Sequence, residues 1–213
     1  MSHQGTSKPE WRLSSSSDPV DYAEALQAME VRVQGIQNAS ASELVWLLEH
    51  PPLYTLGTSA NATDVLDSAL PTYTTGRGGK VTYHGPGQRV AYLMLDLNQR
   101  SKDLRAYVHA LEAWLILTLR HFDIKAERRL GRIGLWVTAA GEERKIAAIG
   151  VRVQKWVTSH GIALNVSPNL RHFQGIVPCG LANYGVTSMH DLGIPCAMDH
   201  VDAVLRQTFE KIF

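Results

Sequence analysis

Three β-rich stretches follow one another between residues 133 and 166 with only short turns between them. They are Ile133 to Val137, Ile146 to Lys155 and Val157 to Val166, and the connecting residues are polar or include glycine. Consecutive strands argue against a regular βαβ winding, in which a helix follows every strand. The pattern favours an α/β or α+β sandwich, a mixed sheet packed with helices.

Helical periodicity predicts the helices that would form the other layer of this sandwich. Leu104 to Phe122 has apolar residues at helical spacing and predicts a long central helix lying on the sheet. A first helix is expected where Asp18 serves as N-cap with Pro19 in the first turn, and Asp199 to Phe213 predicts a closing helix. Further strands are expected at Glu43 to His50, Leu53 to Leu56 and Gln88 to Leu97.

The size and composition of the chain fit one globular unit. With 213 residues and 45% hydrophobic composition, it can bury a substantial core. We expect a flexible, Ser-rich arm over residues 1–17 and a single catalytic domain over residues 18–213. A formal net charge of +1 gives no support for nucleic-acid binding. Neither a signal peptide nor a membrane-spanning run is present in the sequence, so we expect a cytoplasmic protein.

A Gly-rich segment runs from Arg77 to Gln88 and holds four glycines and a proline. Such a loop lets the backbone approach a ligand closely, although a plain hairpin explains the glycines equally well. The segment has neither the spacing of a P-loop nor that of a dinucleotide fingerprint. Nucleotide binding by those routes is therefore not expected.

The two cysteines are the candidates for a nucleophile. Cys179 lies between Pro178 and Gly180, and Cys196 follows Pro195 in a similar context, so the sequence context does not separate them. A buried, inert thiol is the ordinary state of either one. Lys145 enters an apolar stretch directly after a charged turn, where it marks the end of a strand or acts as a base or as the cation beside a thiolate. Histidine and cysteine spacings show no metal motif, so no metal is expected.

Motifs spread over nearly the whole chain after the N-terminal arm resemble one known family, the octanoyltransferases of lipoate biosynthesis. The Arg-Gly-Gly-x-x-Thr-Tyr-His-Gly-Pro-Gly-Gln block and the Pro-Cys-Gly turn are together highly specific. One mild departure is Thr58, where many relatives have arginine. The matching segments are Val45–Pro52, Tyr54–Gly57, Arg77–Gln88, Lys145–Gly150, His160–Asn165 and Val177–Gly180.

The resemblance implies a fold similar to the catalytic domain of biotin and lipoate protein ligases, with Cys179 and Lys145 as a catalytic pair. Cys196 then becomes structural. It also implies an acyl pocket, and no cofactor. The pocket residues would be Arg77, Gly78, Gly79, Lys80, Val81, Thr82, Tyr83, His84, Ala148, Ile149, Gly150, Gly161, Ile162 and Ala163.

The implied reaction transfers an octanoyl or lipoyl group from acyl carrier protein to a lysine of lipoate-dependent enzymes. The expected acceptors are the lipoyl domains of 2-oxoacid dehydrogenase complexes and the H protein of glycine cleavage. Cys179 would carry the acyl group as a thioester, with oxyanion donors among the N–H groups of Cys179 and Gly180 and the side chain of His84. No membrane or nucleic-acid partner is expected.

Local charge suggests where an acidic carrier would dock. Residues 120 to 155 hold nine Lys or Arg against four Asp or Glu. These charges form either a docking face or ordinary solvated turns. Three rival functions stay open: an ATP-dependent lipoate protein ligase, a cysteine-dependent thioester hydrolase and a non-catalytic acyl-binding module.

Overall fold

A computed structural model describes residues 8–67, 69–139, 141–177 and 184–213. Within these residues the main element is an eight-stranded sheet with the strand order β1-β2-β6-β10-β9-β8-β7, and β11 adds to β9. Its strands are β1 (Glu10–Leu13), β2 (Leu44–Leu48), β6 (Gln88–Met94), β7 (Glu127–Arg129), β8 (Arg132–Ala139), β9 (Glu142–Gln154), β10 (Val157–Asn165) and β11 (Gly185–Val186).

The large sheet is mixed, as the sequence predicts. The pairs β1–β2 and β11–β9 are parallel, whereas β2–β6, β6–β10, β10–β9, β9–β8 and β8–β7 are antiparallel. The three consecutive strands expected from residue 133 onward are β8, β9 and β10. All nine residues of β10 are buried, because it lies at the centre of the sheet with helices on both faces.

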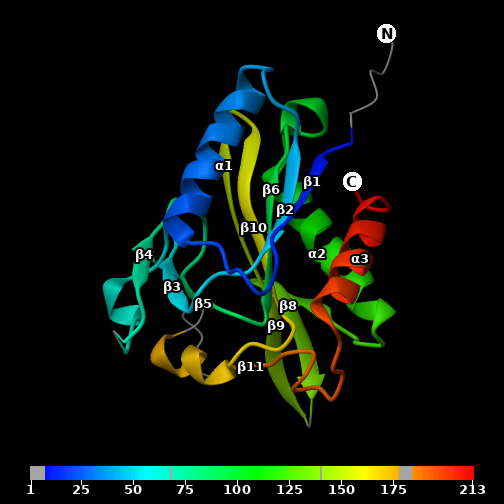
Figure 1. Cartoon of the computed structure of the whole chain (residues 1–213). Helices are drawn as coiled ribbons and strands as arrows, with labels where there is room; N and C mark the ends of the chain where they lie inside the picture. The colour runs from blue at the N-terminus through cyan, green and yellow to red at the C-terminus, as the bar shows by residue number, and fades with distance from the viewer. Residues whose placement is uncertain (1–7, 68, 140, 178–183) are drawn as a thin grey trace.

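In the part of the chain that the structure describes, three α-helices cover the sheet (Figure 1). They are α1 (Tyr22–Gln37) on one face, and α2 (Leu104–His121) with α3 (Met198–Phe209) on the other. Alternate strand residues feed two cores: Val45 and Leu47 of β2 pack in the cluster under α2 and α3, whereas Trp46 and Leu48 pack in the cluster under α1. Short 3₁₀ turns occupy Ala62–Asp64, Leu97–Gln99 and Leu170–Gly175.

A second, small sheet of order β4-β3-β5 lies beside the first, and the Gly-rich segment joins the two (Figure 1). Its strands are β3 (Leu53–Leu56), β4 (Thr72–Thr74) and β5 (Val81–His84). Because β5 pairs with β3 and β6 pairs with β2 and β10, the Gly85–Gly87 turn carries the chain from one sheet to the other. A hairpin across this turn, one of the two interpretations of the sequence, is therefore wrong.

The N-terminal segment differs from expectation in two places. Residues 10–13, within the predicted flexible arm, form β1, and the Trp11 ring packs 5.2 Å from that of Phe209. The first helix is capped by Asp21 and not by Asp18, since Asp21 accepts hydrogen bonds from the amides of Ala23 and Glu24. The chain turns at Ser16–Asp18, where the Asp18 amide donates to the Ser15 carbonyl, and the Val20 amide then donates to the carbonyl of Glu49 instead of entering a helix.

Candidate active site

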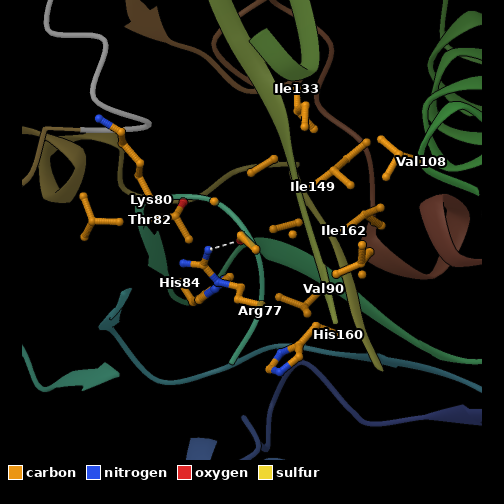
Figure 2. A pocket seen from close by; sticks show the side chains of 18 of the residues that line it. Arg77, Lys80, Thr82, His84, Val90, Val108, Ile133, Ile149, His160 and Ile162 are labelled. Atoms are coloured by element: carbon orange, nitrogen blue, oxygen red, sulfur yellow. Dashed lines mark hydrogen bonds between the residues drawn. The ribbon is translucent and has the colours of Figure 1, made fainter. Parts of the chain in front are cut away.

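A cavity of about 380 Å³ lies where β9 extends past its neighbour β8 (Figure 2). β10 pairs with β9 from Ala147 to Gln154, whereas β8 pairs with it only from Glu142 to Ala147. Beyond Ala147 the Gly-rich loop takes the place of β8. The Gly78 amide donates a 2.9 Å hydrogen bond to the carbonyl oxygen of Val151, which attaches the loop to this edge.

The cavity contains nearly all of the residues predicted for the acyl pocket. Every one of the fourteen except Tyr83 lines it, from the Gly-rich loop, β5, β9 and β10. Thr82 and His84 point into the cavity from β5, while Tyr83 between them packs on the opposite face against Phe173, 5.2 Å away between ring centroids. The predicted pocket included Tyr83 because the motif is contiguous in the sequence. Successive side chains of a strand point to opposite faces, so Tyr83 lies outside the cavity.

Several lining residues were not anticipated. Their signal in the sequence was weak, because most of them belong to an ordinary apolar or aromatic pattern in a helix or strand, and only the fold brings them to one cavity. They are Tyr22, Val90, Tyr92, Leu104, Val108, Gly131, Arg132, Ile133, Val151 and His160.

Arg77 is buried and fixes the loop from inside. Its Nη2 donates to the carbonyl oxygen and to the hydroxyl of Thr55, both at 2.7 Å, and its Nη1 donates to the carbonyl of Gly78 at 2.9 Å. The guanidinium thus ties β3 of the small sheet to the loop that borders the cavity. Charge-assisted bonds of this kind hold geometry more firmly than neutral ones.

Gly150 explains why a glycine stands in the middle of β9. A Cβ at this position would lie 3.0 Å from both the Arg77 Cδ and the Gly78 carbonyl oxygen. Such a contact is tighter than the surrounding loop accommodates without moving. The missing side chain therefore lets the loop seat on the strand and keeps the cavity narrow.

A chain of hydrogen bonds sets the tautomer of His84. Asn165 Nδ2 donates to the Thr187 carbonyl at 2.9 Å, so its Oδ1 is the acceptor for Gln88 Nε2 at 3.0 Å. The remaining Gln88 oxygen then accepts from His84 Nδ1 at 2.7 Å. In a neutral imidazole the other nitrogen is an acceptor. His84 Nε2 is therefore not the oxyanion donor that the sequence suggested.

Buried histidines and tyrosines close the end of the cavity around Arg77. Burial lowers the pKa of His84 well below its usual value, lowers the pKa of His50 to about 4 and lowers that of His160 to about 3. His50 Nδ1 donates to the Val20 carbonyl at 2.7 Å, and its Nε2 accepts from the Tyr92 hydroxyl at 2.7 Å. This wall is therefore neutral near pH 7, apart from Arg77.

Lys145 lies at the other end of the cavity, on β9 opposite β8. Its side chain is buried with 7% exposure, and its Nζ donates a 3.1 Å hydrogen bond to the Ile133 carbonyl oxygen. The Nζ also lies 4.8 Å from the ring centroid of Trp136, a cation–π distance. β9 begins at Glu142, so the charged residues before Lys145 belong to the strand and not to the turn.

Cys179 lies outside the described residues. The chain that follows it is placed beside Lys145: the Tyr184 ring lies 5.4 Å from that of Trp136, and Val186 pairs with Lys145. Cys196 is partly buried against the core under α2 and α3, and burial raises the pKa of its thiol. A raised pKa disfavours the thiolate, so Cys196 is the less reactive type of cysteine.

The described ranges contain no group of histidine, cysteine and acidic side chains arranged to hold a metal ion. Among the helices in those ranges, none has both the length and the apolar character needed to cross a membrane.

Comparison with known proteins gives the family. Residues 21–210 match the lipoyl protein ligase A/B catalytic domain. The octanoyltransferase of Paramagnetospirillum magneticum is 60% identical over 206 residues, covering 96% of each chain. The octanoyltransferase of Rhodopseudomonas palustris strain BisA53 is 59% identical, covering 95% of this chain and 88% of the relative. The chain belongs to the octanoyltransferase family.

Solved structures share the fold at much lower identity. A bi-partite lipoate protein ligase from Thermoplasma acidophilum has a TM-score of 0.69 and 16% identity, covering 96% of this chain and 84% of the other. A lipoate-protein ligase A bound with ATP has a TM-score of 0.69 and 15% identity, covering 95% and 85%. The predicted ligase-like fold is therefore confirmed.

Proposed function

We propose that this octanoyltransferase moves an octanoyl or lipoyl group from acyl carrier protein to Cys179 and then to a lysine of its acceptors. The acceptors would be the lipoyl domains of 2-oxoacid dehydrogenase complexes and the glycine cleavage H protein. The observation that carries the proposal is Lys145, a buried amine at one end of a cavity with largely apolar walls. We expect the reaction to occur in the cytoplasm, where thiols stay reduced.

The cavity suits a medium-length acyl tail. Ala148, Ile149, Gly150, Ile162 and Val90 supply small or aliphatic surfaces along it. Burying roughly seven methylene or methyl groups at about 0.8 kcal/mol each contributes roughly 6 kcal/mol to binding. With the tail bound toward the neutral histidine wall, the thioester carbonyl lies at the Lys145 end of the cavity.

In the first half-reaction the Cys179 thiolate attacks the carrier's thioester carbonyl. The bond to the pantetheine sulfur breaks as the bond to Cys179 forms, and the carrier leaves as a thiol after taking a proton from the Lys145 ammonium, which becomes neutral. An ordinary cysteine with a pKa of about 8.5 is only a few per cent thiolate at pH 7. A cationic Lys145 would raise this fraction by stabilising the thiolate.

In the second half-reaction the acceptor lysine attacks the acyl-Cys179 carbonyl and releases the thiolate. An amine with a pKa of about 10.4 is neutral in roughly one molecule in 2,500 at pH 7, a deficit of about 4.6 kcal/mol. Lys145, once neutral, would remove the excess proton from the acceptor amine as general base. No ATP is needed, because the incoming thioester is already activated.

Acceptor dependence tests the proposal against the rival functions. Octanoyl-loaded carrier is mixed with the protein in the absence of ATP, with and without a lipoyl domain, and the acyl group is followed by mass spectrometry. We expect octanoyl amide on the lipoyl-domain lysine only. Release of free octanoate at the same rate without acceptor would identify a hydrolase, and a strict ATP requirement would identify a ligase.

A further inference from the structure

Exposed apolar side chains gather at the Lys145 end of the cavity. Leu104 at the start of α2 and Ile133 on β8 line the cavity, yet they are 46% and 58% exposed. Leu130, in the turn between β7 and β8, is fully exposed. Single exposed apolar residues are ordinary on a surface, but a group of them around one opening marks a binding surface.

The contacts between the β7–β8 hairpin and α2 bring these residues together. Arg128 of β7 contacts the middle of α2: its Nε lies 2.8 Å from Glu112 Oε2, and its Nη2 donates to the His109 carbonyl at 2.9 Å. Ala126 lies two residues earlier and borders the same surface hollow as Ile116 and Arg120, nearer the end of the helix. The hairpin therefore runs antiparallel to α2, and its tip extends toward Leu104.

Basic residues without acidic partners line this cavity or adjoin its lining residues in the chain. Lys80 lines the cavity, and Lys102 and Arg105 flank Leu104 in the chain. In the described part of the chain these three side chains form no ion pair with a carboxylate. They therefore offer positive charge to a partner.

The basic window over residues 120 to 155 is different. Most of its cations form ion pairs with carboxylates of this chain. Two of these carboxylates, those of Glu112 and Asp191, lie outside residues 120 to 155, so a charge count over that window does not include them. The matched side chains are Lys125, Arg128, Arg129, Arg132 and Arg144.

We propose that the rim formed by Lys80, Lys102, Leu104, Arg105, Leu130 and Ile133 is the docking surface for the acidic acyl carrier protein. This inference rests on the proposed function. Lys145 lines the same end of the cavity. When the thioester is bound beside Lys145, the carrier protein, joined to it by the pantetheine arm, lies outside the cavity against the rim. Unpaired cations complement an acidic helical surface and the apolar residues supply the central contact.

The test uses two donors that differ only in the protein. Octanoyl-carrier and octanoyl-pantetheine present the same thioester, but the second has no surface to dock. Leu130→Glu and Arg105→Glu are compared with Val31→Glu, at a 65% exposed position on α1, and with Lys211→Glu beyond α3. We expect KM for octanoyl-carrier to rise about tenfold in the rim variants, as for a central interface contact. KM for octanoyl-pantetheine should be unchanged, and the control variants should behave as wild type.

Ionic strength provides a second readout. Added salt should raise KM for octanoyl-carrier in the wild type and raise it less in Arg105→Glu. An unchanged KM for octanoyl-carrier in both rim variants would overturn the docking surface. An equal rise in KM for octanoyl-carrier and octanoyl-pantetheine would also overturn it. A rise confined to the KM for the lipoyl domain would overturn it too, because it would assign the rim to the acceptor. Failure of the wild type to transfer from either donor would instead contradict the proposed function.

Discussion

Lys145 Nζ and the carbonyl oxygen of Ile133 are joined by a 3.1 Å hydrogen bond that links β9 to β8 at the open end of the cavity. Trp136, 4.8 Å from the same Nζ, supplies an aromatic surface beside it. A long, flexible side chain is thereby held in one place. The position of the amine is set by the strands and does not need a substrate to order it.

Replacing Lys145 by Met removes the amine and keeps the length of the side chain. We expect both half-reactions to slow by roughly 100-fold or more, the usual contribution of a positioned proton-transfer group. Single-turnover rates of acylation from octanoyl-carrier and of discharge to a lipoyl domain measure the two steps separately. Lys125→Met, at an exposed lysine, is the control. Unchanged rates in Lys145→Met would remove Lys145 from the mechanism.

His84 should remain a neutral imidazole with its proton on Nδ1. The acceptor role of Gln88 Oε1 requires the proton on Nδ1, and the lowered pKa of His84 keeps the ring neutral. Nitrogen chemical shifts of histidine-labelled protein between pH 5.5 and 8, assigned with His84→Asn, would report it directly. An Nε2-protonated ring, or a titration near pH 6.5, would show that the network through Asn165 does not set the tautomer.

The buried histidines should make the protein less stable in mild acid. In the unfolded chain a histidine titrates near pH 6.5, whereas His50 titrates at about 4 and His160 at about 3 in the fold. Between these values the unfolded state binds more protons, so stability is present above pH 6.5 and declines as pH falls. Each buried histidine contributes a slope of about 1.4 kcal/mol per pH unit.

Asp202 has the opposite effect on stability, so the total stability declines less steeply with falling pH than the histidines alone would cause. Burial raises its pKa to about 6, so between about pH 4 and 6 the folded state holds this proton more tightly than the unfolded state. Urea unfolding from pH 7 to 4.5 measures the sum. His160→Asn should reduce the decline in stability, and asparagine suits the left-handed backbone at φ 58°. His109→Gln, at an exposed histidine, should leave the decline unchanged. A stability that does not change over this range in the wild type would contradict the neutral histidine wall.

Glycines of the Gly-rich loop and of β9 should differ in their tolerance of a methyl group. Gly150→Ala places a Cβ 3.0 Å from the Gly78 carbonyl and from Arg77, and should cost about 1–3 kcal/mol and reduce transfer. Gly78→Ala is the matched control, because its nearest neighbour, the Val151 carbonyl oxygen, is 3.5 Å away. Unfolding and transfer rates of the two variants check this. Equal behaviour would show that the loop is not seated on β9 as described.

Much of the fold follows from local patterns in the sequence. Alternating and helical periodicity predict β8 to β10, α2 and α3 within a few residues, because long regular elements carry their own signal. The start of α1 is wrong because Asp18 and Asp21 are equally good caps, and only the tertiary bond between Val20 and Glu49 distinguishes them. β1 was missed since a lone edge strand has little pattern of its own.

The candidate site was less predictable from residues alone. Periodicity does not reveal that β9 extends past β8, and that difference in strand pairing opens the cavity. Lys145 and the Gly-rich block were candidates from the residues and received their roles through a family resemblance, while Tyr22, Val108 and His160 come to the cavity only through the fold. A charge count over residues 120–155 also omits ion pairs that the fold makes with residues elsewhere in the chain, such as that between Arg128 and Glu112 of α2.

The most direct test of the central claim is the intact mass of the protein after mixing with octanoyl-loaded carrier. Wild type and Cys196→Ser should each gain one octanoyl group, mapped to Cys179 by peptide analysis, and should lose it when a lipoyl domain is added. Cys179→Ser should gain none. An unmodified wild type that still transfers octanoate, or an adduct that persists in Cys179→Ser, would contradict the covalent relay through Cys179.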